Sequence, residues 1–185
     1  MKPSGIAAQR QHAALQLGFY LASWGMYRGS TFLLQHAYTV HVGVVDCLAS
    51  SRFAPLWERD FGSEADDVEL VPVILEAAEA ISKAYRQFGQ PTETLVTKVL
   101  LGTFGCLPAC DQYFVAGFRR AGLGYSYLNA KFVRKLLDFS RKHLTELRSE
   151  QADIRDHSGA HYPLMKLTDM YFWQLGYEAG AQSED

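Results

Sequence analysis

The chain has 185 residues, of which 48% are hydrophobic and 13% aromatic, and its net charge is −2. This composition excludes an intrinsically disordered protein, and the near-neutral charge gives no overall attraction to nucleic acid or anionic membranes. No run reaches the roughly 18 unbroken apolar residues of a membrane span, so we expect no membrane partner. A chain of this length predicts a single globular domain.

The first predicted element is a helix that runs from Ser4 to about Met26. Ser4 can cap its start, and apolar residues then recur at the spacing of one helix face. Polar residues 10–12 interrupt the apolar run, and no cleavage site follows a basic start, so we interpret the segment as a helix and not as a signal peptide. Gly29 is placed to end this helix, and Ser30 to cap the next one.

The segment 37–48 is ambiguous on sequence alone. Alternating valines from Val40 to Val44 are typical of a β-strand, and β-branched residues favour strands. Gly43, however, is a poor strand residue, and the pattern fits a helix that starts at Val40 equally well. We favour the helix because no partner strand is evident nearby.

The rest of the chain is predicted to be helical, with breaks at glycines, prolines and polar loops. Thr92 and Asn129 are suitable N-caps, and Pro108 suits the first turn of a helix. The predicted helices span 68–88, 92–105, 109–121, 129–149 and 164–178, with a polar loop over 150–160. The prediction is therefore an all-α protein, a single helical domain of about seven helices over 1–178 with a frayed tail over 179–185.

Charge is distributed unevenly along the chain. Residues 58–79 carry eight acidic side chains and one basic side chain, whereas residues 119–148 carry eight basic and two acidic ones. Two interpretations stay open: solvated helix faces that attract each other, or an anion-binding surface for phosphate or nucleic acid on the predicted helix 129–149. That helix has little exposed aromatic character, so stacking on bases is not indicated.

The sequence Tyr27-Arg28-Gly29-Ser30 lies at the junction of two predicted helices. An arginine beside a hydroxyl group and the free N–H groups of a starting helix predicts a pocket for an oxyanion or a phosphate. The alternative is that Arg28 bonds the last carbonyls of the first helix while Ser30 is a plain cap. Tyr27, Arg28 and Ser30 are therefore candidate ligand-binding residues.

His36 and His41 are candidate general bases, because histidine titrates near neutral pH. They are five residues apart, which differs from the four-residue spacing of paired metal ligands on a helix, and no His-Glu-x-x-His motif occurs. Histidines in apolar surroundings are also common as hydrogen-bonded core residues. We predict no metal site and no cofactor from this pattern.

A second unusual cluster lies in the segment 97–114. Lys98 is embedded among apolar residues, and Asp111 follows Pro108 by three residues. Either Asp111 complements the N-terminus of a helix, or it pairs with Lys98 or Arg28 inside a pocket. Lys98 is therefore a further candidate ligand-binding residue, and Asp111 is a candidate catalytic residue.

The three cysteines predict a reducing, cytoplasmic environment, because an odd number argues against a disulfide framework. Cys106 and Cys110 form the sequence Cys-Leu-Pro-Ala-Cys, which lacks the two-residue spacing of redox and zinc pairs. We interpret both as small core residues.

The strings LASWGMYRGSTFLL and LLGTFGCLPACDQYF resemble motifs of a family of uncharacterised bacterial proteins. This resemblance implies no activity. The second string is also faintly similar to the lysine–proline–aspartate turn in proteins distantly like helix-hairpin-helix DNA glycosylases, but the Gly-x-Gly turn of those enzymes is missing. HEPN-type ribonucleases place an arginine and a histidine closer together than Arg28 and His36 or Arg134 and His143.

Three functional hypotheses follow, and whether the protein is an enzyme stays open. The first is a polar pocket that binds or acts on a small anionic or phosphate-bearing ligand, with the candidate residues Tyr27, Arg28, Ser30, His36, His41, Lys98 and Asp111. The second is a non-enzymatic interaction module, as a homodimer or complex subunit, that uses Tyr171-Phe172-Trp173. The third, which we favour less, acts on nucleic acid through the basic helix 129–149.

Overall fold

The computed structural model describes residues 3–57 and 59–181, and these residues are helical without β-strands. This confirms the all-α prediction. The described residues form nine α-helices, where the sequence predicted about seven, and four short 3-10 helices. The α-helices are α1 (Pro3–Ser23), α2 (Val42–Leu48), α3 (Ala54–Trp57), α4 (Val71–Arg86), α5 (Glu93–Phe104), α6 (Gln112–Arg120), α7 (Ala130–Lys142), α8 (Leu144–Ser158) and α9 (Leu164–Ala181). The 3-10 helices are η1 (Phe32–Gln35), η2 (Tyr38–His41), η3 (Ser51–Phe53) and η4 (Ala65–Leu70).

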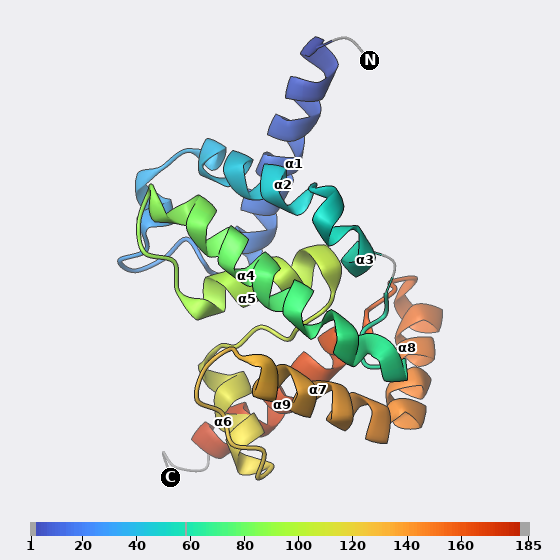
Figure 1. The fold of residues 1–185 in the computed structure, drawn as a ribbon. Coiled ribbons are helices and arrows are strands. Elements are labelled where there is room, and N and C mark those ends of the chain that lie inside the picture. Colours follow the sequence, from blue (N-terminus) through green and yellow to red (C-terminus); the bar gives the residue numbers. More distant parts are fainter. Residues whose placement is uncertain (1–2, 58, 182–185) are drawn as a thin grey trace.

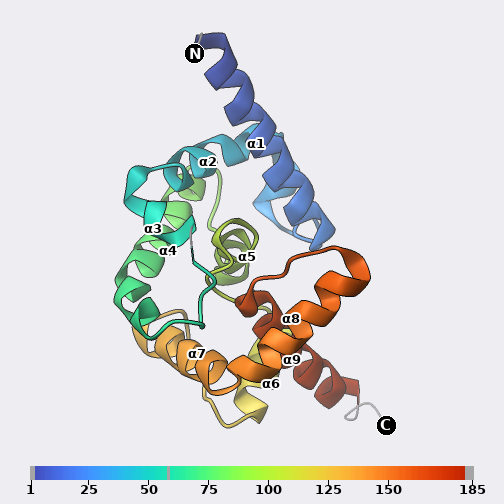
Figure 2. The ribbon, with the colours of Figure 1, turned by 90° about the vertical axis from the view of Figure 1, so that its right-hand side faces the viewer.

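Helix α5 lies at the centre of the molecule, with the other helices arranged around it (Figure 1, Figure 2). Its buried residues include every position from Leu95 to Leu101, so it is enclosed on all sides. Polar groups in such a helix must find partners inside the protein. The Tyr20 hydroxyl of α1 donates to the carbonyl of Lys98, and the Thr97 hydroxyl accepts from the N–H of Cys110.

The first helix ends three residues earlier than predicted, at Ser23. Gly25 has a φ of +67°, in the left-handed region, and the N–H of Met26 bonds the carbonyl of Leu21 at 3.0 Å. This is the Schellman arrangement that commonly ends helices at a glycine. The stop is therefore Gly25 and not Gly29, and a loop follows the helix.

The loop over 24–31 leads into the segment whose structure was ambiguous. That segment is helical, as favoured, because η2 and α2 together cover 38–48. The prediction that Ser30 caps the next helix is wrong. Thr31 is the cap of η1, and its hydroxyl accepts from the N–H of Leu33.

Helix α6 begins at Gln112, three residues later than predicted. Asp111 is its N-cap, and one carboxylate oxygen accepts from two N–H groups of the first turn at 3.1 and 3.0 Å. The N–H groups of Ala109 and Cys110 bond to side chains of α9 and α5, which hold these residues outside the helix. Pro108 therefore lies in a connector and not in a first helical turn.

The predicted helix 129–149 is wrong in its second half, although Asn129 caps its start by accepting from the N–H of Phe132. The chain turns at His143, which separates α7 from α8. The polar loop predicted over 150–160 is also wrong, because α8 continues to Ser158. Its polar sequence has a structural reason: Gln151 is buried and donates to the carbonyl of Tyr162 and to Asp60.

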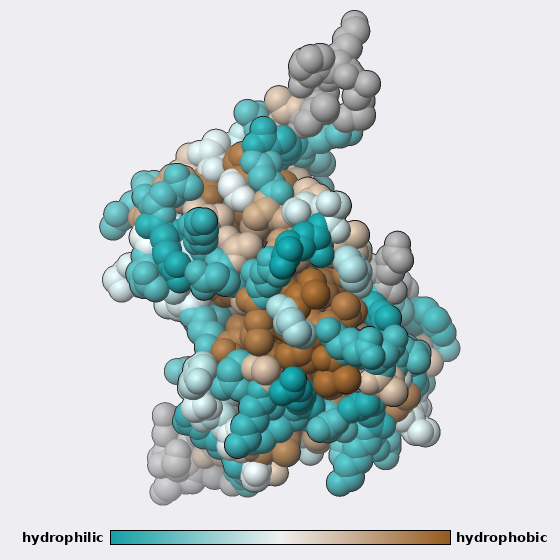
Figure 3. All heavy atoms as spheres, viewed as in Figure 1, coloured by the Kyte–Doolittle hydropathy of each residue, from teal (hydrophilic) through white to brown (hydrophobic). Residues whose placement is uncertain are grey.

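The last helix extends beyond its predicted end. Residues 179–181 belong to α9, and the remainder of the predicted tail lies outside the described residues. None of the described helices combines the length and the apolar character that crossing a membrane requires. Figure 3 shows hydrophobic residues reaching the surface in the middle of one face, around α4 and α7, within a hydrophilic periphery.

Among the described residues, the acidic segment 58–79 and the basic segment 119–148 are joined by two polar contacts. Arg148 pairs with Asp60 at 2.7 Å, and Arg141 donates to the carbonyl of Ala65 at 3.4 Å. The attraction between the two segments is therefore present, but in the described part of the chain it is carried by a single ion pair, between an exposed arginine and a half-buried aspartate. Such pairs contribute little to stability.

Helices α6 and α9 cross at two facing glycines, Gly117 and Gly176. A Cβ atom at Gly117 would lie 1.9 Å from the backbone oxygen of Phe172, and one at Gly176 would lie 1.9 Å from that of Tyr113. Backbone atoms cannot yield as flexible side chains do, so only glycine fits this crossing. The close approach places Tyr113 of α6 against Trp173 of α9, with ring centroids 5.2 Å apart.

We therefore expect Gly117→Ala and Gly176→Ala each to lower the free energy of unfolding by at least about 2 kcal/mol, because overpacking forces backbone shifts. Urea denaturation would measure this. Gly43→Ala is the matched control within a helix, since its Cβ would meet nothing closer than 3.9 Å. The control should stabilise the protein by about 0.5–1 kcal/mol. Equal effects at Gly43 and Gly176 would contradict the close crossing.

Candidate functional site

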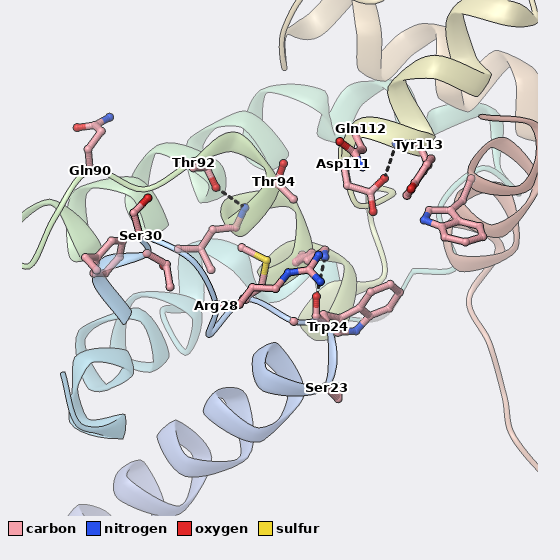
Figure 4. A pocket seen from close by; sticks show the side chains of 17 residues that line it. Ser23, Trp24, Arg28, Ser30, Gln90, Thr92, Thr94, Asp111, Gln112 and Tyr113 are labelled. Atoms are coloured by element: carbon pink, nitrogen blue, oxygen red, sulfur yellow. Dashed lines mark hydrogen bonds between the residues drawn. The ribbon is translucent and has the colours of Figure 1, made fainter. Parts of the chain in front are cut away.

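A cavity of about 1040 Å³ opens between the loop over 24–31, the first turns of α5, the start of α6 and one residue of α9 (Figure 4). Four of the seven predicted site residues line it, namely Arg28, Ser30, Lys98 and Asp111. The other lining residues are Ser23, Trp24, Gly25, Met26, Thr31, Phe32, Gln90, Thr92, Thr94, Leu95, Gln112, Tyr113 and Trp173. We call this cavity the Arg28 pocket.

Arg28 is an exposed residue on the rim of the pocket, in the loop that follows α1. Its guanidinium group folds over Gly25, where an added Cβ would lie 3.3 Å from the Arg28 Cζ. Within the described part of the chain, this guanidinium makes no hydrogen bond or ion pair. The alternative that Arg28 bonds the last carbonyls of the first helix is therefore not what the structure shows.

Lys98 reaches the pocket from α5 and is buried, with a relative exposure of 6% for the residue. Its Nζ donates to the carbonyl of Trp24 at 3.1 Å and lies 5.1 Å from the centroid of the Trp24 ring. Burial lowers the pKa of Lys98, the carboxylates of Asp111 and Asp169 oppose this shift, and the cations Arg28 and Lys166 add to it.

Asp111 faces the pocket from the N-terminus of α6. The oxygen that caps the helix accepts both hydrogen bonds, and the second oxygen has no partner among the described residues. No direct ion pair joins Asp111 to Lys98 or Arg28 in the described ranges. Asp111 is thus a helix cap, and it shares the pocket with both cations without contacting either.

Two charged residues beside the pocket were not predicted from the sequence. Asp169 of α9 is buried, accepts from the N–H of Ala109 at 2.9 Å and pairs with Lys166 at 3.1 Å. Lys166 lies over the Trp24 ring, 4.0 Å from its centroid. The only sequence signal was their spacing of three residues in the last predicted helix, which is also typical of a solvated helix face.

His41 does not line the pocket. It is fully buried, and its ring nitrogens Nε2 and Nδ1 lie 2.5 and 2.7 Å from the hydroxyls of Tyr27 and Tyr85. Burial lowers the pKa of His41 to about 4 and raises the pKa of both tyrosines. The neutral imidazole donates to one hydroxyl and accepts from the other, so His41 ties Tyr27, next to Arg28, to the core.

His36 also lies away from the pocket. It is half-buried, its Nε2 is 3.4 Å from the carbonyl oxygen of Phe88, and its ring packs against Phe32 and Phe88. The structure therefore does not bring His36, His41 and Asp111 into one cavity. Tyr27 acts as an anchor for the loop and not as a lining residue.

Burial raises the pKa of all three cysteine thiols. Cys106 and Cys110 are free and fully enclosed, as the interpretation as core residues requires, and burial raises the pKa of both thiols. Burial raises the pKa of Cys47 to about 11. The described residues hold no group of three or more histidine, cysteine and acidic side chains that could bind a metal ion.

Chemically, the Arg28 pocket offers two cations, one free carboxylate oxygen and several hydroxyl and amide groups. Arg28 and Lys98 can hold an anion, and Asp111 can accept a proton or a hydrogen bond. Comparison with protein-family models, with curated proteins and with solved structures finds no match. The resemblance to bacterial proteins therefore stays a prediction, although both of its motif strings contribute residues to the pocket.

The depressed pKa of His41 predicts a pH-dependent stability. The unfolded chain binds a proton on this ring near pH 6.5, but the folded protein binds it only near pH 4. The unfolded state thus holds more protons in this window, so stability should fall by about 3 kcal/mol as the pH drops from 6.5 to 4. We expect His41→Gln to be less stable at pH 7. Its stability should no longer show this fall between pH 6.5 and 4.

The measurement is urea denaturation of both proteins at several pH values, together with an NMR titration of the His41 ring. A ring that titrates near pH 6.5 in the folded protein would contradict its burial between the two tyrosines.

Proposed function

We propose that the Arg28 pocket binds a small anionic ligand of the phosphate type. The observation that carries this proposal is that Arg28 and Lys98 converge on one cavity while neither is paired with a carboxylate in the described part of the chain. Most other arginines of the chain pair with an acidic side chain, for example Arg59 with Asp66 and Arg10 with Asp46. An unpaired arginine and a buried lysine on the same cavity can both bind an anion.

The electrostatics of Lys98 support the proposal. Burial lowers the pKa of Lys98, Asp111 and Asp169 oppose this shift, and Arg28 and Lys166 add to it, so keeping the ammonium charged costs free energy. An anion between Lys98 and Arg28 would offset that cost, because opposite charges a few ångströms apart attract strongly in a partly desolvated site.

The walls of the pocket supply further donors. Ser30 contributes a hydroxyl, whereas the Thr94 hydroxyl already donates to the carbonyl of Cys110 at 2.9 Å. Residues of the first turns of α5 and α6 line the pocket, and Asp111 caps two N–H groups of α6. Helix N-termini carry partial positive charge, which favours bound anions. Asp111 and Glu93 reduce this field, so the side-chain cations carry the main attraction.

The two other hypotheses find less support in the fold. Of the aromatic residues in α9 that motivated an interaction module, Phe172 is fully buried and Trp173 packs on Tyr113 and Tyr177, which leaves Tyr171 at 48% exposure. The proposal of a nucleic-acid surface rests on exposed cations of α7 such as Arg134. A cytoplasmic location also stays a proposal, supported by the free cysteines.

The first test is phosphate binding by isothermal titration calorimetry at low ionic strength. We expect Arg28→Gln to weaken phosphate binding by at least about ten-fold, because charge-assisted hydrogen bonds are worth roughly 1.5–3 kcal/mol. Its free energy of unfolding should change by less than about 0.5 kcal/mol, since Arg28 contacts no other charge. Arg134→Gln, which removes an exposed arginine of α7, should leave phosphate binding unchanged. Absence of binding to the unaltered protein, or equal losses in both variants, would contradict the proposal.

A second test uses the protonation of Lys98. Sulfate keeps a constant charge between pH 6 and 10, so its affinity reports on the protein alone. Because an anion favours the protonated amine, affinity should fall as the pH rises through the lowered pKa of Lys98, below the ordinary value of 10.5. In Lys98→Met, sulfate should bind more weakly at pH 7, and its affinity should change little up to pH 10. The same pH profile in both proteins would show that Lys98 does not contact the anion.

A further inference from the structure

The Arg28 pocket is much larger than a phosphate ion needs. At about 1040 Å³ it falls at the upper end of the range of roughly 300–1,000 Å³ that small-molecule sites occupy. In Figure 4, Arg28 lies between one group formed by Ser30, Gln90 and Thr92 and another formed by Asp111 and Tyr113, so the pocket extends on both sides of Arg28.

The end of the pocket near α6 is aromatic. Tyr113 and Trp173 both line it and meet edge to face at 5.2 Å. Tyr177 stacks on one face of Trp173 at an interplanar angle of 8° and holds the indole in place. Neither Tyr113 nor Trp173 is fully buried, so part of each ring remains available to a flat ligand group.

Asp111 sets the polarity of this same end. The carboxylate oxygen that does not cap α6 faces the cavity. Among the described residues, no group donates a hydrogen bond to this oxygen. A carboxylate repels a phosphate group but accepts a hydrogen bond from N–H. This end of the pocket is therefore suited to a flat group that donates an N–H, whereas Arg28 and Lys98 are suited to an anion.

Resting on the proposed function, we infer that the ligand is a nucleoside phosphate. Its phosphate lies at Arg28 and Lys98, and its base lies against Tyr113 and Trp173 with an N–H group donating to Asp111. Every nucleobase has a π face for the rings and at least one N–H group for the carboxylate. Sugar phosphates without a base satisfy the cations but leave the aromatic end empty.

The experiment measures by calorimetry the affinities of four probes: inorganic phosphate, ribose 5-phosphate, adenosine and AMP. CMP, GMP and UMP extend the comparison to nucleotides with other bases. We expect nucleoside monophosphates to bind at least about ten-fold more tightly than ribose 5-phosphate, in line with the contribution of base–aromatic stacking. Arg28→Gln should weaken binding of phosphate, ribose 5-phosphate and nucleotides alike, while leaving adenosine nearly unaffected.

Asp111→Asn gives a test in which two affinities move in opposite directions. Asparagine is as good an N-cap as aspartate, so α6 should persist, with the amide oxygen on the helix and the amide nitrogen towards the cavity. Inorganic phosphate should then bind a few-fold more tightly, because a negative charge is removed. The ratio of the affinities for AMP and ribose 5-phosphate should fall by about five-fold or more. The reason is that the carboxylate oxygen that accepts the N–H of the base is replaced by an amide nitrogen that donates.

Two aromatic variants, Trp173→Leu and Tyr113→Leu, complete the design. Each should reduce the ratio of the affinities for AMP and ribose 5-phosphate while leaving the binding of inorganic phosphate unchanged. Unchanged phosphate binding also shows that the variant is folded. Tyr127→Leu is the matched control, since Tyr127 is 62% exposed and lies outside the pocket.

The outcomes separate the inference from the function on which it rests. If phosphate and ribose 5-phosphate bind and depend on Arg28, but no nucleotide binds more tightly, the inference is overturned while the proposed function stands. If none of the phosphate-bearing probes binds, both are overturned. If nucleotides bind tightly but the Asp111 and Trp173 variants leave their advantage intact, the base lies elsewhere and the inference is again overturned.

Discussion

The hydrogen bond from the Lys98 Nζ to the carbonyl of Trp24 joins the central helix to the loop that carries Arg28. It brings a charge from the enclosed central helix to the wall of a large cavity. A buried ammonium cannot be tolerated without partners, and here they are a backbone carbonyl, the face of an indole ring and nearby carboxylates. This contact holds the start of the loop that carries Arg28 against the central helix.

The other walls of the pocket are fixed by buried polar contacts of the same kind. His41 holds Tyr27 and so the far side of the loop, whereas Asp169 holds the connector before α6 through the N–H of Ala109. The glycine crossing of α6 and α9 then places Tyr113 beside Trp173. The rigid elements thus supply the aromatic and acidic end of the site, and a loop supplies the exposed cation.

The sequence predicted the elements whose signals are local. Thr92 and Asn129 cap helices as expected, and the helix in 37–48 was correctly favoured, since caps and propensities act over a few residues. The division of 129–149 at His143 and the helical character of α8 were missed, because the polar residues of α8 are satisfied by distant groups such as Asp60. A single sequence does not show such partners.

For the candidate site, residue type gave good guidance and geometry could not be predicted. Arg28, Ser30, Lys98 and Asp111 stood out as polar groups in apolar stretches, and they line one cavity. His41 stood out for the same reason but faces two tyrosines, a difference that depends on how η2 packs against α1 and α4. Asp169 and Lys166 gave no distinctive signal, since opposite charges three residues apart are common on exposed helices.

The most direct test of the central claim uses the three tryptophans of the chain. Trp24 and Trp173 line the pocket, while Trp57 packs on Phe104 away from it, at 4.7 Å between ring centroids. The indole N–H signals of nitrogen-15-labelled protein would be followed by NMR while phosphate is added. The account predicts a saturable shift of the Trp24 signal and an unmoved Trp57 signal. No shift of Trp24, or equal shifts of all three signals, would contradict an anion site at Arg28 and Lys98.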